Sequence, residues 1–422
     1  MNDRTIAYKI LLKIEKDKAY SNLTLDGVLS QEEACYEPFV RALVYGVIER
    51  KITLDYILSE FLSQPIKKLK PQVLTVLRMG VYQIKYMDKV PVSAAVNESV
   101  KLVKQQGFSF ASGLVNSVLR KTADSEIIYP KNENSTEYLS VKYSCPTDLV
   151  NRYINDYGFE NAIGILSTAL ETPPLNIRVN TLRTTAEELV KMLQNEGIEA
   201  SDCDVEGALT VNGGNVFATD CYKNGLFHVQ DLASQICINA LDPKPYETVL
   251  DMCAAPGGKS FTIAEKMQNK GKIYSYDLYE HRTSLINSGA KRLGIDIIHT
   301  KTLDASVFYS DMPLADKILC DVPCSGLGVI RRKPEIKYKD LAFIDKLTDL
   351  QYNIICSSSL YLKKGGRLVY STCSLNKDEN ENVCSRFLET HKDFELLDGS
   401  PVTLMPHTDR TDGFFFAVFI RE

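Results

Sequence analysis

The first 125 residues carry apolar side chains at the three- and four-residue spacing of amphipathic helices. The stripes comprise Ile6, Ile10, Leu11 and Ile14, then Val73, Leu77, Val81 and Ile84, then Val96, Val100 and Val103. Prolines at positions 65, 71 and 91 separate these stretches. The pattern predicts a small all-α bundle that closes its own core.

The pattern changes after this region. Residues 126–145 are polar, which is typical of a linker or loop. Further on, alternation over 175–180 predicts a strand, 186–194 is an amphipathic helix, and strands are expected at 198–203 and 208–211. We therefore expect a small α/β domain here.

From residue 248 onward the pattern is regular. Apolar runs of strand length alternate with stretches of helix length, at residues 248–252, 272–276, 297–303, 317–320 and 367–371. Such alternation is typical of a doubly wound parallel sheet. A late run at 414–420 predicts a final, antiparallel strand. The chain is thus multidomain, with an all-α domain (1–130), a small α/β domain (131–240) and an α/β domain (241–422).

Composition and charge narrow the class of protein. The 422 residues are 44% hydrophobic and 24% charged, the balance of an ordinary globular protein. No apolar run approaches the roughly 18 residues that a membrane helix needs, and Lys and Arg interrupt the N-terminal segment. We expect a cytoplasmic monomer. The net charge of −5 divides into +4 for residues 1–130 and −9 for the rest. The basic N-terminal region permits a phosphate-bearing partner without requiring one.

The cysteines indicate reduced thiols and no metal. There are 11, an odd number, spread along a long chain, and no C-x-x-C pair exists. Cys320 and Cys324 are four apart, but no second pair or spaced histidine supports a zinc site. The five histidines lie in unrelated contexts.

A strand, a glycine-rich loop and a helix follow one another from Val249 to Met267. Glycines let a ligand approach the backbone, and the helix N-terminus offers N–H groups. Asp277 ends the next predicted strand, twenty residues after Gly257, where an acid accepts hydrogen bonds from a ribose diol. The combination indicates a cofactor that contains a nucleoside.

The loop does not match a pyrophosphate motif. Gly258-Lys-Ser260 imitates the end of a P-loop, but Cys253 stands where that motif needs glycine, and G-x-G-x-x-G is absent. S-adenosylmethionine, a nucleoside without phosphates, fits better. Asp304 ends the third strand and either meets the adenine amino group or caps a helix.

Two further motifs follow later strands of the predicted sheet. Asp321 ends the strand that leads into Asp321-Val-Pro-Cys324, and Cys373 follows the next strand in Ser371-Thr-Cys-Ser374. Carboxyl ends of parallel strands share one edge, so the aspartate and two cysteines are expected in one crevice.

These motifs, with Cys253-Ala-Ala-Pro-Gly-Gly-Lys259, resemble in order and spacing the RNA 5-methylcytosine methyltransferases of the Fmu/Sun and nucleolar-protein family. Segments 174–180 and 229–235 resemble the part that precedes the family's catalytic domain. Segments 77–82, 91–97 and 113–120 resemble the NusB-like domain of a bacterial branch that modifies small-subunit ribosomal RNA. The resemblance implies a Rossmann-like S-adenosylmethionine-dependent methyltransferase domain and 16S ribosomal RNA as partner.

The resemblance also implies a role for each motif residue. Cys373 would add to cytosine C6 as a thiolate, Asp321 would bind the base at N3 and N4, and Cys324 would assist release. What lowers the pKa of Cys373 stays open, with the sulfonium charge and Lys259 as candidates. The expected cofactor-binding residues are Cys253, Ala254, Ala255, Pro256, Gly257, Gly258, Lys259, Asp277, Asp304 and Asp321.

Other interpretations remain open at this point. The basic segment 331–339 suits RNA phosphates or is a solvated run of charge. The substrate could instead be transfer RNA or large-subunit ribosomal RNA. A P-loop nucleotide hydrolase and an RNA-binding module without catalysis are the rival function classes.

Overall fold

The structure, a computed structural model, describes residues 2–17, 20–32 and 35–422 and contains two compact units. The helical unit consists of Met1–Glu171 and Ile330–Lys339. The sheet unit consists of Thr172–Val329 and Asp340–Glu422. The compact units thus divide at Glu171, whereas the domain boundaries at 130 and 240 stay predictions.

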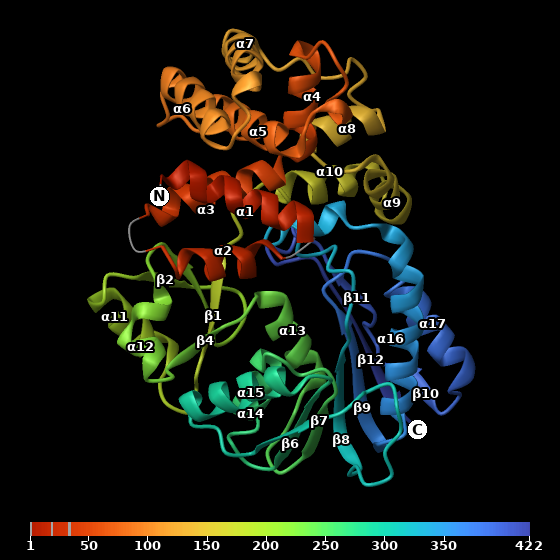
Figure 1. Cartoon of the computed structure of the whole chain (residues 1–422). Helices are drawn as coiled ribbons and strands as arrows, with labels where there is room; N and C mark the ends of the chain where they lie inside the picture. The colour runs from red at the N-terminus through yellow and green to blue at the C-terminus, as the bar shows by residue number, and fades with distance from the viewer. Residues whose placement is uncertain (1, 18–19, 33–34) are drawn as a thin grey trace. The chain divides into compact units, whose positions relative to one another are not determined.

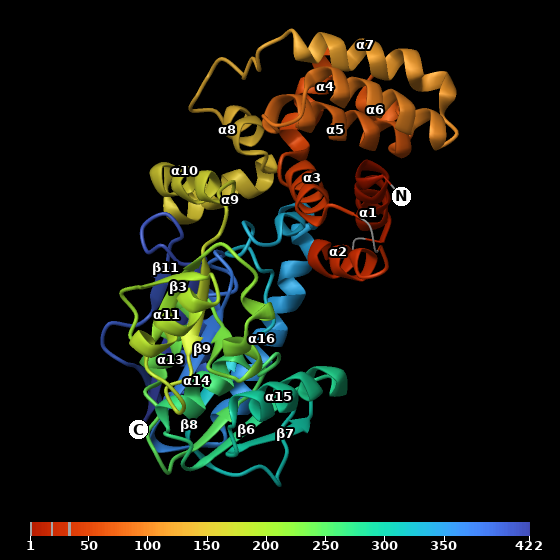
Figure 2. The same ribbon diagram turned by 90° about the vertical axis from the view of Figure 1, so that its left-hand side faces the viewer.

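The helical unit confirms the all-α prediction, and α5, α6 and α7 run alongside one another in it (Figure 2). The stripe residues Ile10, Leu77 and Val103 are fully buried in its core. Its helices are α1 (Asp3–Asp17), α2 (Ser21–Leu29), α3 (Glu37–Glu49), α4 (Lys51–Phe61), α5 (Pro71–Tyr86), α6 (Val92–Gln105), α7 (Ser112–Ala123), α8 (Thr136–Tyr143), α9 (Thr147–Tyr157) and α10 (Phe159–Thr168).

The expectation of a loop through 126–145 is wrong for its second half, which forms α8. Ser135, one of the polar residues that indicated a loop, is the N-cap and accepts a hydrogen bond from the Tyr138 backbone N–H at 3.1 Å. Serine favours helix starts as strongly as turns, so its presence alone did not distinguish them.

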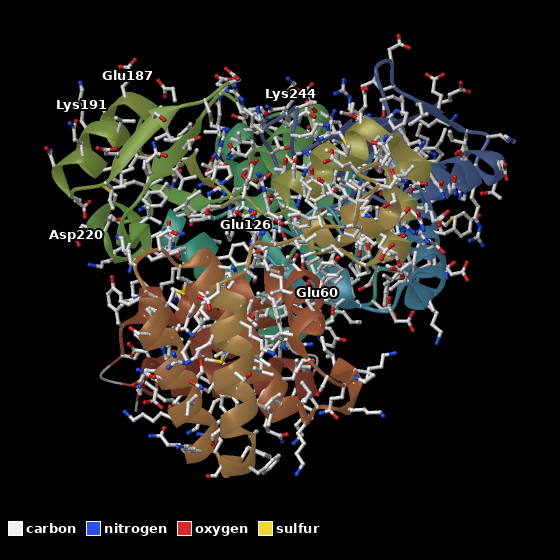
Figure 3. All side chains as sticks on the ribbon, turned by 90° about the horizontal axis from the view of Figure 1, so that it is seen from above. Glu60, Glu126, Glu187, Lys191, Asp220 and Lys244 are labelled. Carbon is white, nitrogen blue, oxygen red and sulfur yellow. The ribbon has the colours of Figure 1, made fainter. Side chains whose placement is uncertain are left out.

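The sheet unit begins with a small antiparallel sheet of order β2-β3-β1-β4. On its helix α11, Leu189 and Leu193 are buried, whereas Glu187 and Lys191 point outward (Figure 3). The elements are β1 (Leu175–Val179), α11 (Ala186–Asn195), β2 (Glu199–Asp202), β3 (Ala208–Asn212), α12 (Asp220–Lys223) and β4 (Phe227–Val229). The predicted strands and helix are confirmed, and β4 is an addition.

A large mixed sheet follows, of order β10-β12-β9-β8-β5-β6-β7, with β11 paired to β12. Strands β5 to β9 are parallel, and β12 is antiparallel to β9, as predicted. The strands are β5 (Thr248–Asp251), β6 (Lys272–Asp277), β7 (Ile298–Thr302), β8 (Ala315–Asp321), β9 (Leu362–Thr372), β10 (Phe394–Leu396), β11 (Val402–Leu404) and β12 (Phe414–Arg421).

Helices cover both faces of this sheet (Figure 1). One face packs against α13 (Leu232–Leu241), α14 (Gly258–Lys266) and α15 (Glu280–Leu293). The other packs against α16 (Ile344–Ser359) and α17 (Glu381–Thr390). The strand order reverses between β5 and β8, and doubly wound sheets bind ligands at the carboxyl ends of the strands that flank such a point.

Candidate active site

The predicted site residues come together at the carboxyl edge of the large sheet. Pairing aligns Asp251 with Ser275, Asp277 with Thr302, and Asp321 with Ser371. Since these strands are parallel, their ends form one row. In strand order that row carries Asp304 after β7, Asp277 on β6, the loop after β5, Asp321 on β8 and Cys373 after β9.

The loop after β5 depends on glycine at position 257. Its φ of +111° is left-handed, and a Cβ there would lie 2.5 Å from the Phe261 ring. Gly257 is also the N-cap of α14 and supplies no side-chain cap to the helix N-terminus.

Asp277 is buried against this loop. Its Oδ2 accepts a hydrogen bond from the Ala255 backbone N–H at 3.3 Å, and Oδ1 accepts one from the Tyr279 N–H at 3.3 Å. Arg282 contacts both Asp277 and Ala255. Its Nη1 lies 3.2 Å from Asp277 Oδ2, and its Nη2 donates to the Ala255 carbonyl at 3.0 Å. The loop after β5 and the Asp277 carboxylate are therefore fixed relative to each other.

The last loop residue connects to the second motif. Lys259 Nζ lies 2.8 Å from Asp321 Oδ2, while Ser371 Oγ donates to Asp321 Oδ1 at 2.8 Å. Burial opposes the charge on Lys259, but its ion pair with Asp321 raises the pKa of the ammonium above its ordinary value, and Cys373 contributes in the same direction. A lysine paired in this way is not free for phosphate, which argues against the P-loop interpretation.

The two cysteines also meet. Cys324 Sγ and Cys373 Sγ are 3.2 Å apart, and the Gly328 N–H donates to the Cys373 carbonyl at 2.9 Å. The hydrogen bond with Cys373 and burial raise the pKa of the Cys324 thiol well above its ordinary value. The Cys324 side chain is therefore held as the neutral thiol.

The Asp304 side chain forms hydrogen bonds with a residue close to it in the sequence. Its Oδ1 accepts hydrogen bonds from the Ser306 N–H at 2.9 Å and the Ser306 hydroxyl at 2.7 Å. These bonds form a turn; no helix begins there in the described chain, so the helix-cap alternative is wrong.

The sequence prediction missed two buried acids beside the site. Asp251 ends β5 and accepts a hydrogen bond from Ser260 Oγ at 2.6 Å, and burial raises its pKa to about 7. An acid inside the apolar run of β5 was a visible signal. Glu379 bonds to both cysteine loops, and nothing in its spacing indicated this.

The basic segment 331–339 belongs to the helical unit. Glu335 accepts hydrogen bonds from Ser21, the Lys337 ammonium donates to the Glu49 carbonyl, and Tyr338 donates to the Ile48 carbonyl. Lys337 is buried, so for this lysine both alternatives, a phosphate contact and a solvated run of charge, are wrong.

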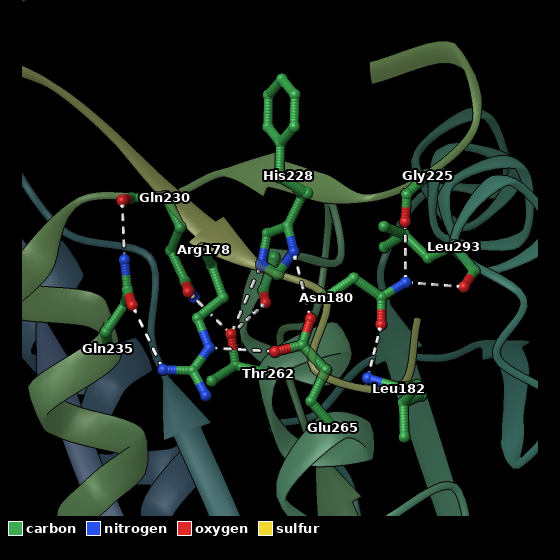
Figure 4. A network of polar contacts seen from close by, with 12 residues as sticks. Arg178, Asn180, Leu182, Gly225, His228, Gln230, Gln235, Thr262, Glu265 and Leu293 are labelled. Atoms are coloured by element: carbon green, nitrogen blue, oxygen red, sulfur yellow. Dashed lines mark hydrogen bonds and ion pairs between the residues drawn. The ribbon is translucent and has the colours of Figure 1, made fainter. Parts of the chain in front are cut away.

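A buried polar network joins the small sheet to α14 (Figure 4). Arg178 of β1 donates through Nε to Glu265 Oε2 at 2.9 Å, and both side chains are almost inaccessible to solvent. Thr262 donates to Gln230 at 2.7 Å, and His228 lies between Thr262 and Glu265. The helix that starts at the glycine loop is therefore anchored to the small sheet.

Comparison with known proteins gives the family. The model described as 16S rRNA methyltransferase RsmB/F matches residues 238–420, the NusB family matches 1–124, and the RsmF/B-like ferredoxin-like domain matches 145–216. Probable ribosomal RNA small subunit methyltransferase B of Bacillus subtilis (strain 168) is 39% identical over 98% of this chain and 97% of that protein. The chain belongs to the RsmB/F methyltransferase family.

Other relatives of the RsmB/F family agree over the whole length. The probable small subunit methyltransferase B of Synechocystis sp. (strain ATCC 27184 / PCC 6803 / Kazusa) is 33% identical over 98% of both chains. The crystal structure of PH0851 superposes with a TM-score of 0.83 at 27% identity, covering 100% of this chain and 99% of that one. The predicted NusB-like and Rossmann-like domains are thus confirmed, and part of the predicted small α/β domain matches a ferredoxin-like domain. No described helix has the length and apolar character to cross a membrane.

Proposed function

We propose that this protein methylates cytosine C5 in 16S ribosomal RNA, with S-adenosylmethionine as donor and a covalent bond between Cys373 and cytosine C6. The observation that carries the proposal is the pair of sulfurs 3.2 Å apart on the same sheet edge as Asp321 and the glycine loop. The relatives, which are named as ribosomal RNA small subunit methyltransferases, support a small-subunit ribosomal RNA substrate.

The residues at this sheet edge suit the binding of S-adenosylmethionine. Asp277 places a buried carboxylate at the strand end where a ribose diol would donate to it. The uncapped N-terminus of α14 would face the carboxylate of the methionine part. Asp304 would lie on the adenine side, beyond Asp277. When bound, the cofactor supplies an electrophilic methyl group.

Cytosine C5 is a weak nucleophile and must be activated before it can accept a methyl group. Cys373 would activate it, and Cys324 would assist the later release. The Cys373 thiolate adds to C6 and makes C5 enamine-like. The Lys259 ammonium, coupled to Cys373, stabilises that thiolate. After methylation the C5 proton passes to a water molecule, its electron pair restores the C5–C6 double bond and Cys373 leaves as a thiolate, while the N3 proton is also released. The neutral Cys324 thiol beside it would assist by donating a hydrogen bond to the leaving sulfur.

Asp321 would hold the base. Its carboxylate accepts from Lys259 and Ser371 and, with its remaining lone pairs, would accept from the cytosine N4 amino group and from N3–H as the ring becomes protonated on attack. A stacked base cannot be attacked at C6, so the target must be unpaired or flipped out. The helical unit and the small sheet would dock the surrounding RNA.

The test uses the two cysteine variants. Cys373→Ala should abolish methyl transfer, because no C6 adduct forms. Cys324→Ala should accumulate protein covalently attached to RNA, seen as a shifted band on a denaturing gel, because release is blocked. Unchanged methylation by Cys373→Ala would contradict the mechanism. A denaturing gel of Cys324→Ala without a shifted band would also contradict it.

A second experiment identifies the substrate. Mapping 5-methylcytosine in ribosomal and transfer RNA, from cells with and without the protein, should show one lost site in 16S RNA. A site lost only from transfer RNA or the large subunit would move the same chemistry to that substrate. No lost site, together with RNA binding but no cofactor binding in calorimetry, would favour a binding module.

A further inference from the structure

One fully buried glutamate, Glu379, contacts both loops that carry the cysteines. It lies in the turn between β9 and α17. Its Oε1 accepts from the Ser325 backbone N–H at 2.7 Å and from Gln351 Nε2 at 3.0 Å. Its Oε2 accepts from Ser374 Oγ at 2.7 Å and Asn376 Nδ2 at 3.1 Å, and Ser325 Oγ also donates to it.

The partners of this carboxylate are adjacent to the reactive sulfurs. Ser325 follows Cys324, and Ser374 follows Cys373. The two serine hydroxyls also contact each other at 2.8 Å, and Gln351 donates to the Pro323 carbonyl at 2.9 Å. One side chain thus fixes the residue after each cysteine, and in the Cys324 loop it fixes the backbone itself.

The charge of Glu379 acts on the same pair. The pKa of Cys324 is raised first by its hydrogen bond with Cys373 and by burial, and the Glu379 carboxylate raises it further. A negative charge behind this loop favours the neutral thiol of Cys324.

We propose that Glu379 is a positioning residue that holds the Cys324 and Cys373 loops at the separation needed for both thiols to act on one base. The inference rests on the proposed function for its catalytic meaning. Purely structural support of the turn is the alternative. Other bonds already hold that turn, since Thr372 Oγ1 donates to Asn380 Oδ1 at 2.6 Å and Asn380 Nδ2 donates to the Ser374 carbonyl at 2.8 Å.

The first test compares Glu379→Met, which removes every acceptor, with Glu379→Gln, which keeps one oxygen for the Ser325 N–H. Glu389→Gln, at an exposed site on α17, is the matched control. In single-turnover methylation, Glu379→Met should be slower by about a hundredfold, the scale expected for a misplaced reactive group. Glu379→Gln should be severalfold slower than the wild type, because only one of the two acceptor oxygens remains, and S-adenosylmethionine affinity and RNA KM should stay within twofold.

A second test reports geometry without activity. Diamide oxidises two adjacent thiols to a disulfide and is itself reduced to a hydrazine, taking up both protons and both electrons. Peptide mapping should show rapid Cys324–Cys373 bonding in the wild type and in Glu389→Gln, but severalfold slower bonding in Glu379→Gln and Glu379→Met.

The outcomes separate the two hypotheses. Glu379→Met with a wild-type rate, or equally fast disulfide formation in all variants, would overturn the positioning role. If Glu379→Met does not fold, the disulfide rate of Glu379→Gln decides, and a wild-type rate overturns the proposal. A wild type that forms this disulfide rapidly but makes no 5-methylcytosine would overturn the proposed function and leave the loop geometry supported.

Discussion

Burial changes the charge of individual residues in the sheet unit. It raises the pKa of Asp251 to about 7, and, together with the nearby cations Arg178 and Arg292, lowers the pKa of His228 to about 3. Both side chains are thus neutral at pH values where the unfolded chain carries them charged. Such differences link the free energy of unfolding to pH.

His228 gives the residue-scale prediction. Between pH 6.5 and 3 the unfolded chain binds a proton at this histidine, while the folded chain does not. The free energy of unfolding should therefore fall as the pH falls below 6.5, by about 2 kcal/mol from this group between pH 7 and 5. Urea titrations at pH 5, 6 and 7 should show a weaker pH dependence for His228→Gln than for the wild type.

The comparison between variants removes the contributions of titratable groups that do not contact His228. His281→Gln, at an exposed position, serves as the control and should follow the wild type. Parallel pH curves for the wild type and His228→Gln would mean that His228 titrates alike in both states.

At the scale of elements, hydrophobic periodicity predicted the long, regular strands correctly. The parallel strands β5 to β9 and the antiparallel β12 were all visible as apolar runs, and their carboxyl ends gave the site edge. The strands β10 and β11 were missed because three residues each are too few to show alternation.

The contacts within the site were less predictable than its location. Spacing gave the strand ends that carry Asp277, Asp321 and Cys373. The ion pair of Lys259 with Asp321 and the five bonds to Glu379 depend on side-chain directions across neighbouring loops, for which a linear sequence has no period.

The glycine loop gives the element-scale prediction. Gly257→Ala would place a side chain at φ +111° and a Cβ 2.5 Å from the Phe261 ring, so the start of α14 must shift. We expect S-adenosylmethionine affinity, measured by calorimetry, to fall by about tenfold or more, since such backbone strain costs about 1–3 kcal/mol.

Gly113→Ala in α7 is the control for this substitution. A Cβ there would meet no atom within 4 Å, so affinity should be unchanged. Wild-type affinity in Gly257→Ala would show that the cofactor does not depend on this loop conformation.

At the scale of the whole molecule, the small sheet is attached to the methyltransferase sheet through buried charge. The Arg178 guanidinium also donates to the Glu206 carbonyl, so it ties two parts of the small domain to Glu265 on α14. Removing one member of a buried pair leaves the other charge without its partner, whereas removing both leaves none.

This attachment yields the last prediction, a double-mutant cycle. Arg178→Met and Glu265→Met should each lower the free energy of unfolding by about 3–5 kcal/mol, and the double variant should lose clearly less than their sum. The exposed pair Lys223 and Asp220, 3.1 Å apart, is the matched control, and its coupling should stay below about 1 kcal/mol. Additive losses at Arg178 and Glu265 would show that hydrogen bonds to neighbouring carbonyls and amides, and not the ion pair, fix α14 and with it the cofactor loop to the small sheet.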